Sequence, residues 1–149
     1  MSTSKGHSGQ QLTFDPANIP RFSVIRVPYK FDEELIPLSR LFVVLAHAGG
    51  CAICIKATTK TSLYKNNPSQ MAGCIHFQAG EVLCFPEETI IQPDNQIPIE
   101  HSHIRDSHIR DQVQIHTLPS DFPAKLREAV RKSETLTGRE RKRIESLIT

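Results

Sequence analysis

The sequence predicts an α+β protein, built as a small β-barrel of about five to seven short strands with one or two C-terminal helices. Short β-rich runs fill the first two thirds of the chain and are separated by glycine and proline turns. Apolar residues follow helical spacing after Ser120. The chain has 149 residues, of which 38% are hydrophobic, so one domain can bury a core without metal or disulfide staples.

The composition also bounds location and domain organisation. The net charge of +2 is only mildly basic. No apolar run approaches the roughly 18–20 residues that span a bilayer, and the N-terminus lacks a signal-peptide core. We therefore expect a cytoplasmic protein without membrane contact. Its expected parts are a disordered tail at 1–18, a barrel domain at 19–135 and an additional basic helix at 136–149.

The first ordered segment is expected near Ile19. Arg21–Val27 is rich in β-formers and predicts a strand that stops at Pro28. The acidic segment from Tyr29 to Leu38 then predicts a loop that Pro37 closes.

A hairpin comes next. Arg40 begins an apolar run that ends at Leu45, and a Gly49-Gly50 turn connects it to a second β-rich run, Cys51–Thr59. If Arg40 lies at the same end of this hairpin as Thr58 and Thr59, these side chains form a cluster suited to an oxyanion or a phosphate. The alternative is an ion pair between Arg40 and a carboxylate of the preceding acidic loop.

Chemistry at such a cluster needs a proton acceptor, because arginine remains protonated at neutral pH. His47, just past the arginine strand, and His76, on a later strand, are candidates with a suitable pKa range. Sequence spacing places neither beside Arg40, so a structural role for each is the alternative.

The four cysteines raise the question of a metal site. Cys51 and Cys54 have C-x-x-C spacing, but nine residues separate Cys74 from Cys84, which does not match a zinc ribbon. Positions i and i+3 of a strand also face opposite sides. We therefore expect buried free thiols and no metal.

The second half of the barrel is less regular. Lys60–Ala72 is polar and predicts a loop, and short strands are expected at Gly73–Phe77, Val82–Phe85 and Thr89–Ile91. Residues 102–111 repeat the pentapeptide Ser-His-Ile-Arg-Asp. A short duplication that lengthened a loop explains the repeat and both of its histidines.

The C-terminus is predicted to be helical. Ser120 can cap a helix over Phe122–Ser133, and Thr137 with Glu140 has the capping-box pattern for a second helix. Basic residues cluster from Lys125 onward, which fits either a polyanionic partner or, more commonly, a solvated helix face.

The order of these elements resembles the MazF/PemK family of toxin endoribonucleases over roughly residues 20–135. The correspondences are a first strand, a variable loop, an arginine strand, a threonine site and a Leu-Ser step into the last helix, at Val24–Tyr29, Phe31–Ser39, Arg40–Leu45, Ala57–Thr59 and Leu118–Ser120. Three positions depart from the family: Phe22-Ser23 replaces Gly-Asp, Leu41 replaces a proline, and the loop is acidic.

The resemblance implies an SH3-like barrel and a toxin of a toxin–antitoxin pair. The implied activity is metal-independent cleavage of single-stranded RNA by its own 2′-hydroxyl, giving a 2′,3′-cyclic phosphate, without a cofactor. It assigns catalysis to Arg40, Thr58 and Thr59, and the residue chemistry above adds His47 or His76 as the proton acceptor. RNA contacts are then assigned to further cations of the same region, Lys56, Lys60 and Arg26. The implied partners are a cognate antitoxin and a second copy of the chain.

A different class of function uses the same architecture. Small barrels also serve as non-catalytic modules that bind nucleic acid or a protein partner, since a fold does not fix a function. In that case the basic C-terminal helices would supply the phosphate contacts.

Overall fold

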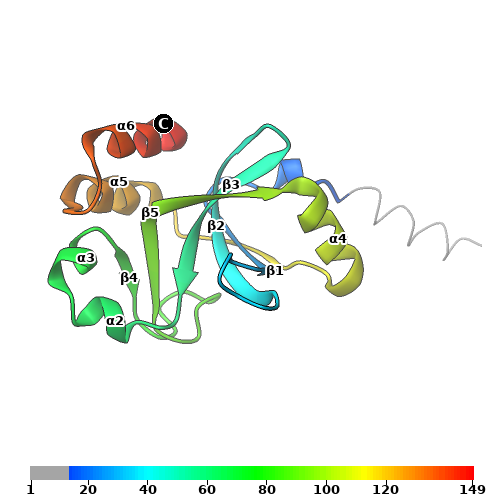
Figure 1. Ribbon diagram of the computed structural model, residues 1–149, viewed down its shortest axis with the longest axis horizontal. Coiled ribbons are helices and arrows are strands. Elements are labelled where there is room, and N and C mark those ends of the chain that lie inside the picture. Colours follow the sequence, from blue (N-terminus) through cyan, green and yellow to red (C-terminus); the bar gives the residue numbers. More distant parts are fainter. Residues whose placement is uncertain (1–13) are drawn as a thin grey trace, which may run out of the picture.

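The computed structural model describes residues 14–149. They form an α+β fold around a six-stranded antiparallel sheet in the order β4-β5-β3-β2-β1-β6, which curls into a half-barrel (Figure 1). The strands are β1 (Ser23–Tyr29), β2 (Leu38–Ala48), β3 (Cys51–Thr58), β4 (Ile75–Phe77), β5 (Thr89–Glu100) and β6 (Ile115–Thr117). The helices are η1 (Pro16–Asn18), α2 (Ser62–Lys65), α3 (Pro68–Ala72), α4 (His101–Asp111), α5 (Phe122–Lys132) and α6 (Gly138–Ile148).

The predicted hairpin forms between β2 and β3. Gly49 and Gly50 make its turn with φ values of +59° and +75°, which is the backbone that a two-residue hairpin turn requires and that glycine adopts without strain. The pairing runs from Ala48 opposite Cys51 to Leu41 opposite Ala57. The turn fixes the register next to it. A β-bulge at Leu45 then shifts the pairing by one residue, which brings Leu41 opposite Ala57.

Both faces of the central strands are buried. In β2, Val43 and Leu45 pack with helices α5 and α6, while Phe42 and Val44 pack in a second cluster that includes Ile104 of α4. Figure 1 shows α5 and α6 at one end of the sheet and α4 at the other. Burial on both faces explains why this strand is a continuous apolar run and not an alternating one.

The prolines do not end the strands, contrary to prediction. β1 continues through Pro28, which pairs with Ser39, and β5 continues through Pro93 and Pro98. Pro28 and Pro98 lie beyond the short strands β6 and β4, where their own strands have a partner on one side only. Pro93 lies in an irregularity of the β3–β5 pairing, between Gln92 and Gln96, so no paired residue needs its N–H.

Two predicted loops are helical and one predicted strand is absent. The segment Lys60–Ala72 contains α2 and α3, and the Asn67 side chain caps α3. The duplicated pentapeptide forms α4. Residues five apart on a helix differ by about 140° in direction, so Ile104 is fully buried while its counterpart Ile109 is 57% exposed. Val82–Phe85 is irregular where a strand was expected.

The ends of the chain contribute to the fold. Residues 1–13 of the expected tail lie outside the described part, but Phe14 stacks on His108 at 3.8 Å between ring centroids, so order begins before Ile19. Asp121, not Ser120, precedes α5, and the capping box of Thr137 and Glu140 begins α6 as predicted.

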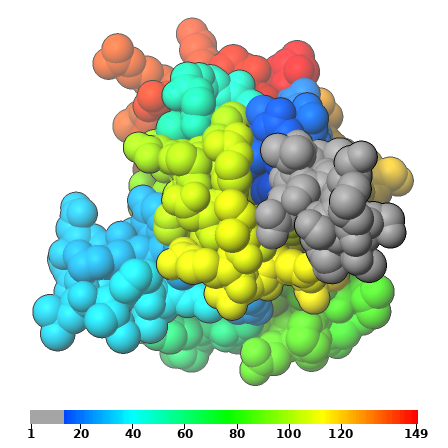
Figure 2. Space-filling model, turned by 90° about the vertical axis from the view of Figure 1, so that its right-hand side faces the viewer, coloured from blue at the N-terminus to red at the C-terminus, as the bar shows by residue number. Residues whose placement is uncertain are grey.

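The surface on the α4 side carries one projecting segment. Figure 2 shows α4 in yellow-green at the centre of this side and the loop between β1 and β2 in light blue beside it. Leu35 in this loop is 94% exposed.

Between residues 14 and 149, every helix is too short or too polar to cross a bilayer.

Candidate active site

Arg40 and Thr58 come together at the open end of the hairpin. Leu41 pairs with Ala57, so Arg40 and Thr58 occupy the next position of the two strands. Phe42 pairs with Lys56, and side chains two residues apart share a face of a strand. Arg40, Lys56 and Thr58 therefore lie on one face of the sheet, as the hairpin predicted for Arg40 and Thr58. Thr59 follows the end of β3 and is exposed.

The acidic loop folds back onto Arg40. Its guanidinium forms an ion pair with Glu34 and donates a hydrogen bond of 3.3 Å to the Tyr29 carbonyl. The ion pair considered above as an alternative is thus present, and Glu34 is the carboxylate that forms it. The Phe31 N–H and the Arg40 guanidinium together lower the pKa of Glu34.

A second cation lies against the same aromatic ring. The Phe31 ring centroid is 4.7 Å from the Arg40 guanidinium carbon and 5.6 Å from Lys56 Nζ. Burial lowers the pKa of Lys56, and the charges of Arg40 and Lys60 lower it further. We call Phe31, Glu34, Arg40, Lys56 and Thr58 the Phe31 cluster. Its cations repel one another, which is the electrostatic condition for attracting an anion.

His47 lies at the far end of β2 from the Phe31 cluster. Seven residues of strand separate it from Arg40, about 23 Å. Its Nε2 contacts the Ile19 carbonyl and its Nδ1 contacts His101 Nε2, both at 2.9 Å. Burial and the neighbouring His47 lower the pKa of His101. His47 therefore cannot accept a proton at Arg40 and has a structural role.

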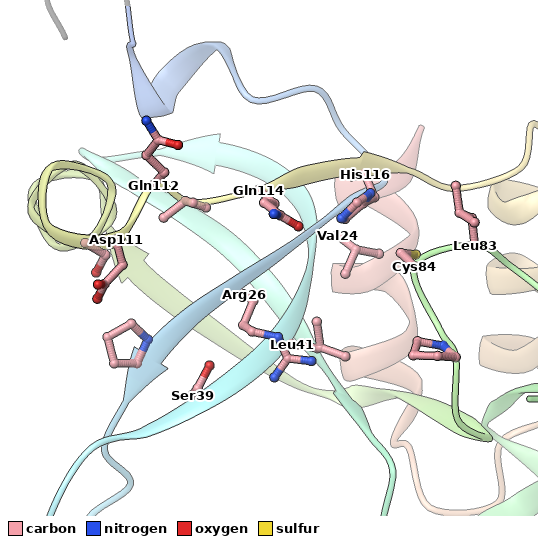
Figure 3. A pocket seen from close by; sticks show the side chains of 14 residues that line it. Val24, Arg26, Ser39, Leu41, Leu83, Cys84, Asp111, Gln112, Gln114 and His116 are labelled. Atoms are coloured by element: carbon pink, nitrogen blue, oxygen red, sulfur yellow. The ribbon is translucent and has the colours of Figure 1, made fainter. Parts of the chain in front are cut away.

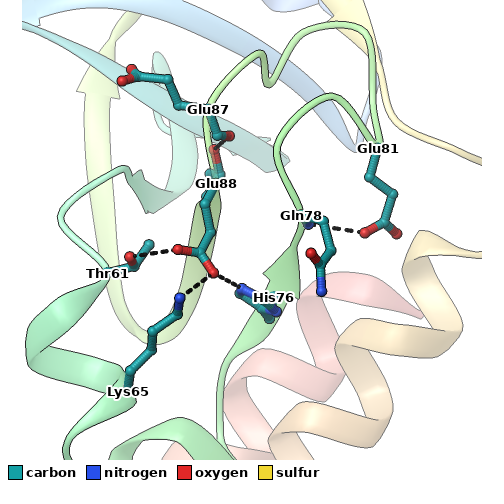
Figure 4. Close-up of polar contacts among 8 residues, drawn as sticks. Thr61, Lys65, His76, Gln78, Glu81, Glu87 and Glu88 are labelled. Atoms are coloured by element: carbon teal, nitrogen blue, oxygen red, sulfur yellow. Dashed lines mark hydrogen bonds and ion pairs between the residues drawn. The ribbon is translucent and has the colours of Figure 1, made fainter.

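His76 lies level with Arg40 across the sheet but three strands away, which separates the two residues by about 14 Å. Its Nε2 is 2.5 Å from Glu88 Oε2, and the same carboxylate contacts Lys65 Nζ at 2.6 Å and accepts a hydrogen bond of 2.9 Å from the Thr61 hydroxyl (Figure 4). These donors lower the pKa of Glu88 to about 2. His76 therefore contacts Glu88, and its strand position keeps it away from the Phe31 cluster.

A cavity of about 620 Å³ opens on the opposite face of the sheet. Arg26 pairs with Leu41, not with Arg40, and it lines this cavity together with Ser39, Gln114 and His116 (Figure 3). No ion pair between residues 14 and 149 involves Arg26. Arg26 is therefore not part of the Phe31 cluster.

The four cysteines are free thiols, but only Cys54 is buried as predicted. The other three, Cys51, Cys74 and Cys84, are half-buried, and Cys74 and Cys84 lie outside the strands. Cys54 is buried on β3, and burial raises its pKa to about 12, while burial and the charge of Asp94 raise the pKa of Cys74 to about 11. A thiol with a raised pKa is a poor nucleophile at neutral pH. We therefore assign neither of these two residues a catalytic role.

Sequence reasoning left Glu34 as one of three possible ion-pair partners of Arg40, and it did not single out His116, which lines the cavity. Glu34 could have been found among the three acidic residues of the loop only by knowing how the loop folds. His116 lies on β6, a strand of three residues, which is too short to leave a period-two signal.

The comparisons with known proteins add no relative. No family model, no curated protein sequence and no solved structure matches this chain. The functional argument therefore depends on the site itself.

Proposed function

We propose that this protein is a metal-independent endoribonuclease that cleaves single-stranded RNA at the Phe31 cluster. The observation that carries the proposal is the position of Arg40 and Thr58 side by side at the ends of β2 and β3, with Lys56 on the same face. A fixed guanidinium, a hydroxyl and an ammonium group can together stabilise a phosphate that gains negative charge.

The chemistry follows from RNA itself. The 2′-hydroxyl attacks the adjacent phosphorus, so the P–O2′ bond forms while the P–O5′ bond breaks. Glu34 accepts the 2′-hydroxyl proton once RNA has displaced it from Arg40. Lys56 donates a proton to the departing 5′ oxygen, and its lowered pKa makes it a stronger acid than an ordinary lysine. Arg40 and Thr58 contact the phosphoryl oxygens. The products are a 2′,3′-cyclic phosphate and a 5′-hydroxyl.

The order of the elements supports a MazF/PemK-like, SH3-like assignment. An arginine strand follows a variable loop, a threonine site ends the next strand, and a helix follows β6 at the C-terminal end. We propose on this basis a toxin neutralised by an antitoxin and active as a homodimer. Arrest of growth on induction, lost with Arg40→Ala, tests the toxin assignment.

The cleavage test compares wild type with Arg40→Ala on a single-stranded RNA in EDTA. We expect wild type to cleave and the variant to lose about 100-fold or more in rate, because loss of one charge-stabilising donor in an active site costs that much. The products should carry cyclic phosphate ends. Wild-type cleavage that EDTA abolishes, or an Arg40→Ala variant with undiminished activity, overturns the mechanism.

Glu34→Gln separates binding from chemistry. Removing the carboxylate frees Arg40, so RNA should bind more tightly, whereas the rate of the chemical step should fall because the proton acceptor is lost. Glu33→Gln is the matched control, since Glu33 is exposed and adjacent. A Glu34→Gln variant that both binds and cleaves like wild type contradicts the role given to this residue.

One observation favours the alternative of a non-catalytic binding module. Glu34 already neutralises Arg40, so neither a free guanidinium nor a nearby His47 or His76 is present at the Phe31 cluster. In that case the protein binds RNA with an affinity that falls steeply as the salt concentration rises, and the RNA remains intact in the assay above.

A further inference from the structure

We propose that the cavity around Arg26 binds a nucleotide, with the phosphate at Arg26 and the base between the polar and apolar walls. This inference does not depend on cleavage at the Phe31 cluster, because Arg26 and Arg40 project from opposite faces of the sheet. The ligand is either a free nucleotide or one unit of an RNA strand, and both present the same phosphate and base.

The cavity is built by the register of three strands. His116 of β6 pairs with Val24, and Arg26 follows two residues later on the same face of β1. Leu41 of β2 pairs with Arg26. Gln112, with a φ of +52°, turns the chain out of α4 and toward β6. Figure 3 shows Gln114 and His116 on one side of Arg26, and Ser39 and Leu41 on the other.

The lining has the composition that a nucleotide needs. Arg26 has no carboxylate within ion-pair distance among residues 14–149, so its charge is available to a phosphate. Gln112 and Gln114 are exposed and offer amide donors and acceptors to base edges. The volume of about 620 Å³ lies within the usual range for small-ligand sites.

The cavity wall that faces the polar residues is apolar and extends outward to the surface. Leu41 and Cys84 are half-buried there, and Leu83 at the rim is 95% exposed. Such a surface can cover the face of a base that water otherwise solvates. Asp111 also lines the cavity, at the end of α4, and its carboxylate can accept hydrogen bonds from ribose hydroxyls or base amino groups.

The test measures binding by calorimetry with the full chain. The probes are the four nucleoside 5′-monophosphates, inorganic phosphate, and a short 2′-O-methyl oligoribonucleotide that lacks the attacking hydroxyl. We expect saturable binding that Arg26→Gln weakens by about 10- to 100-fold, the loss typical of a hydrogen bond to a charged group. Arg139→Gln, at an exposed position of α6, removes the same charge outside the cavity and should bind like wild type.

The other probes decide the ligand class. Binding of monophosphates identifies a free nucleotide as a ligand, and Arg26-dependent binding of the oligonucleotide alone identifies an RNA strand. Absence of saturation with every probe, equal affinity for inorganic phosphate, or an Arg26→Gln variant that binds like wild type overturns the proposal. Gln114→Ala, at an exposed position, repeats the test should Arg26→Gln not fold. Arg40→Ala should retain the binding of monophosphates, which separates the cavity from the cleavage site.

Discussion

The cations on the sheet and on the adjacent helix α2 differ in whether a carboxylate forms an ion pair with them. Glu34 pairs with Arg40 and Glu88 pairs with Lys65, whereas Arg26 has no such partner among residues 14–149. A paired cation attracts a ligand only when the ligand replaces the carboxylate, and an unpaired one attracts it directly. The two arginines are therefore expected to respond differently to removal of neighbouring acids.

Glu88 makes stability depend on pH. Its pKa of about 2 in the folded protein lies below the value of about 4.3 for an unperturbed glutamate. Its contribution to the free energy of unfolding is therefore fully present above about pH 4.3 and is lost as the pH falls toward 2. We expect Glu88→Gln to destabilise the protein at pH 6 and to differ progressively less from wild type below about pH 4.3.

Urea unfolding over this pH range measures the difference. Glu87→Gln is the control, since Glu87 is the exposed neighbour and its carboxylate forms none of the ion pairs between residues 14 and 149. A wild-type minus Glu88→Gln difference that stays constant with pH contradicts the account of this cluster.

The part of the site that sequence could predict is the part fixed by the hairpin. The turn and the two strands have clear signals. The β-bulge at Leu45, which brings Arg40 level with Thr58, has no such signal. The position of Glu34 depends on how a loop of eight residues, 30–37, returns to the sheet, and no periodicity encodes that. His47 is close to Arg40 in sequence. The length of β2 nevertheless places the two side chains far apart.

At the level of elements, the turn between β2 and β3 limits which substitutions the hairpin accepts. A Cβ added at Gly50 would meet no atom within 4 Å, but its φ is +75°, a region that costs an ordinary residue about 1–2 kcal/mol. We expect Gly50→Ala to lower the free energy of unfolding by about that amount through the backbone alone.

Gly138→Ala is the matched control for this substitution. Gly138 also has open space for a Cβ, but it lies in the first turn of α6 without a positive φ, where alanine is the better helix former by up to about 1 kcal/mol. Denaturant unfolding should therefore show opposite signs for the two variants. A Gly50→Ala variant as stable as wild type would refute the requirement for left-handed backbone at this turn.

The elements that sequence missed share one physical reason. β5 contains Pro93 and Pro98, and proline predicts a strand end only where its N–H would be needed by a neighbour. α4 consists of a polar duplication whose helical packing depends on Ile104 meeting the second core cluster. In both cases a long-range partner, absent from any local window, decides the structure.

At the level of the whole molecule, the C-terminal helix closes the core. Ile144 is fully buried and Ile148 is 2% exposed in the cluster shared with α5 and the sheet. Arg21, just before β1, donates a hydrogen bond of 2.9 Å from Nε to the Leu45 carbonyl, and its Nη2 contacts the Leu147 carbonyl. The two ends of the described chain are thereby joined.

Ile144→Ala tests this role. Removing a fully buried isoleucine side chain is expected to cost about 2–5 kcal/mol of the free energy of unfolding. Lys142→Ala, an exposed change on the same helix, should stay within about 0.5 kcal/mol. Chemical denaturation of both variants gives the comparison, and a loss below about 1 kcal/mol for Ile144→Ala would show that α6 is an appendage.

The ion pair between Glu34 and Arg40 also affects which anions can bind to that arginine, according to their size. A carboxylate tethered in the same chain competes with free anions at an effective concentration on the order of millimolar. A small anion at lower concentration cannot displace it. A polymer that also contacts Phe31, Lys56 and Lys60 can displace the carboxylate. Each further contact adds binding free energy, while the entropy cost of association is met only once. For the RNA ligand that we propose, we therefore expect the loop to favour long polyanions over small anions at Arg40.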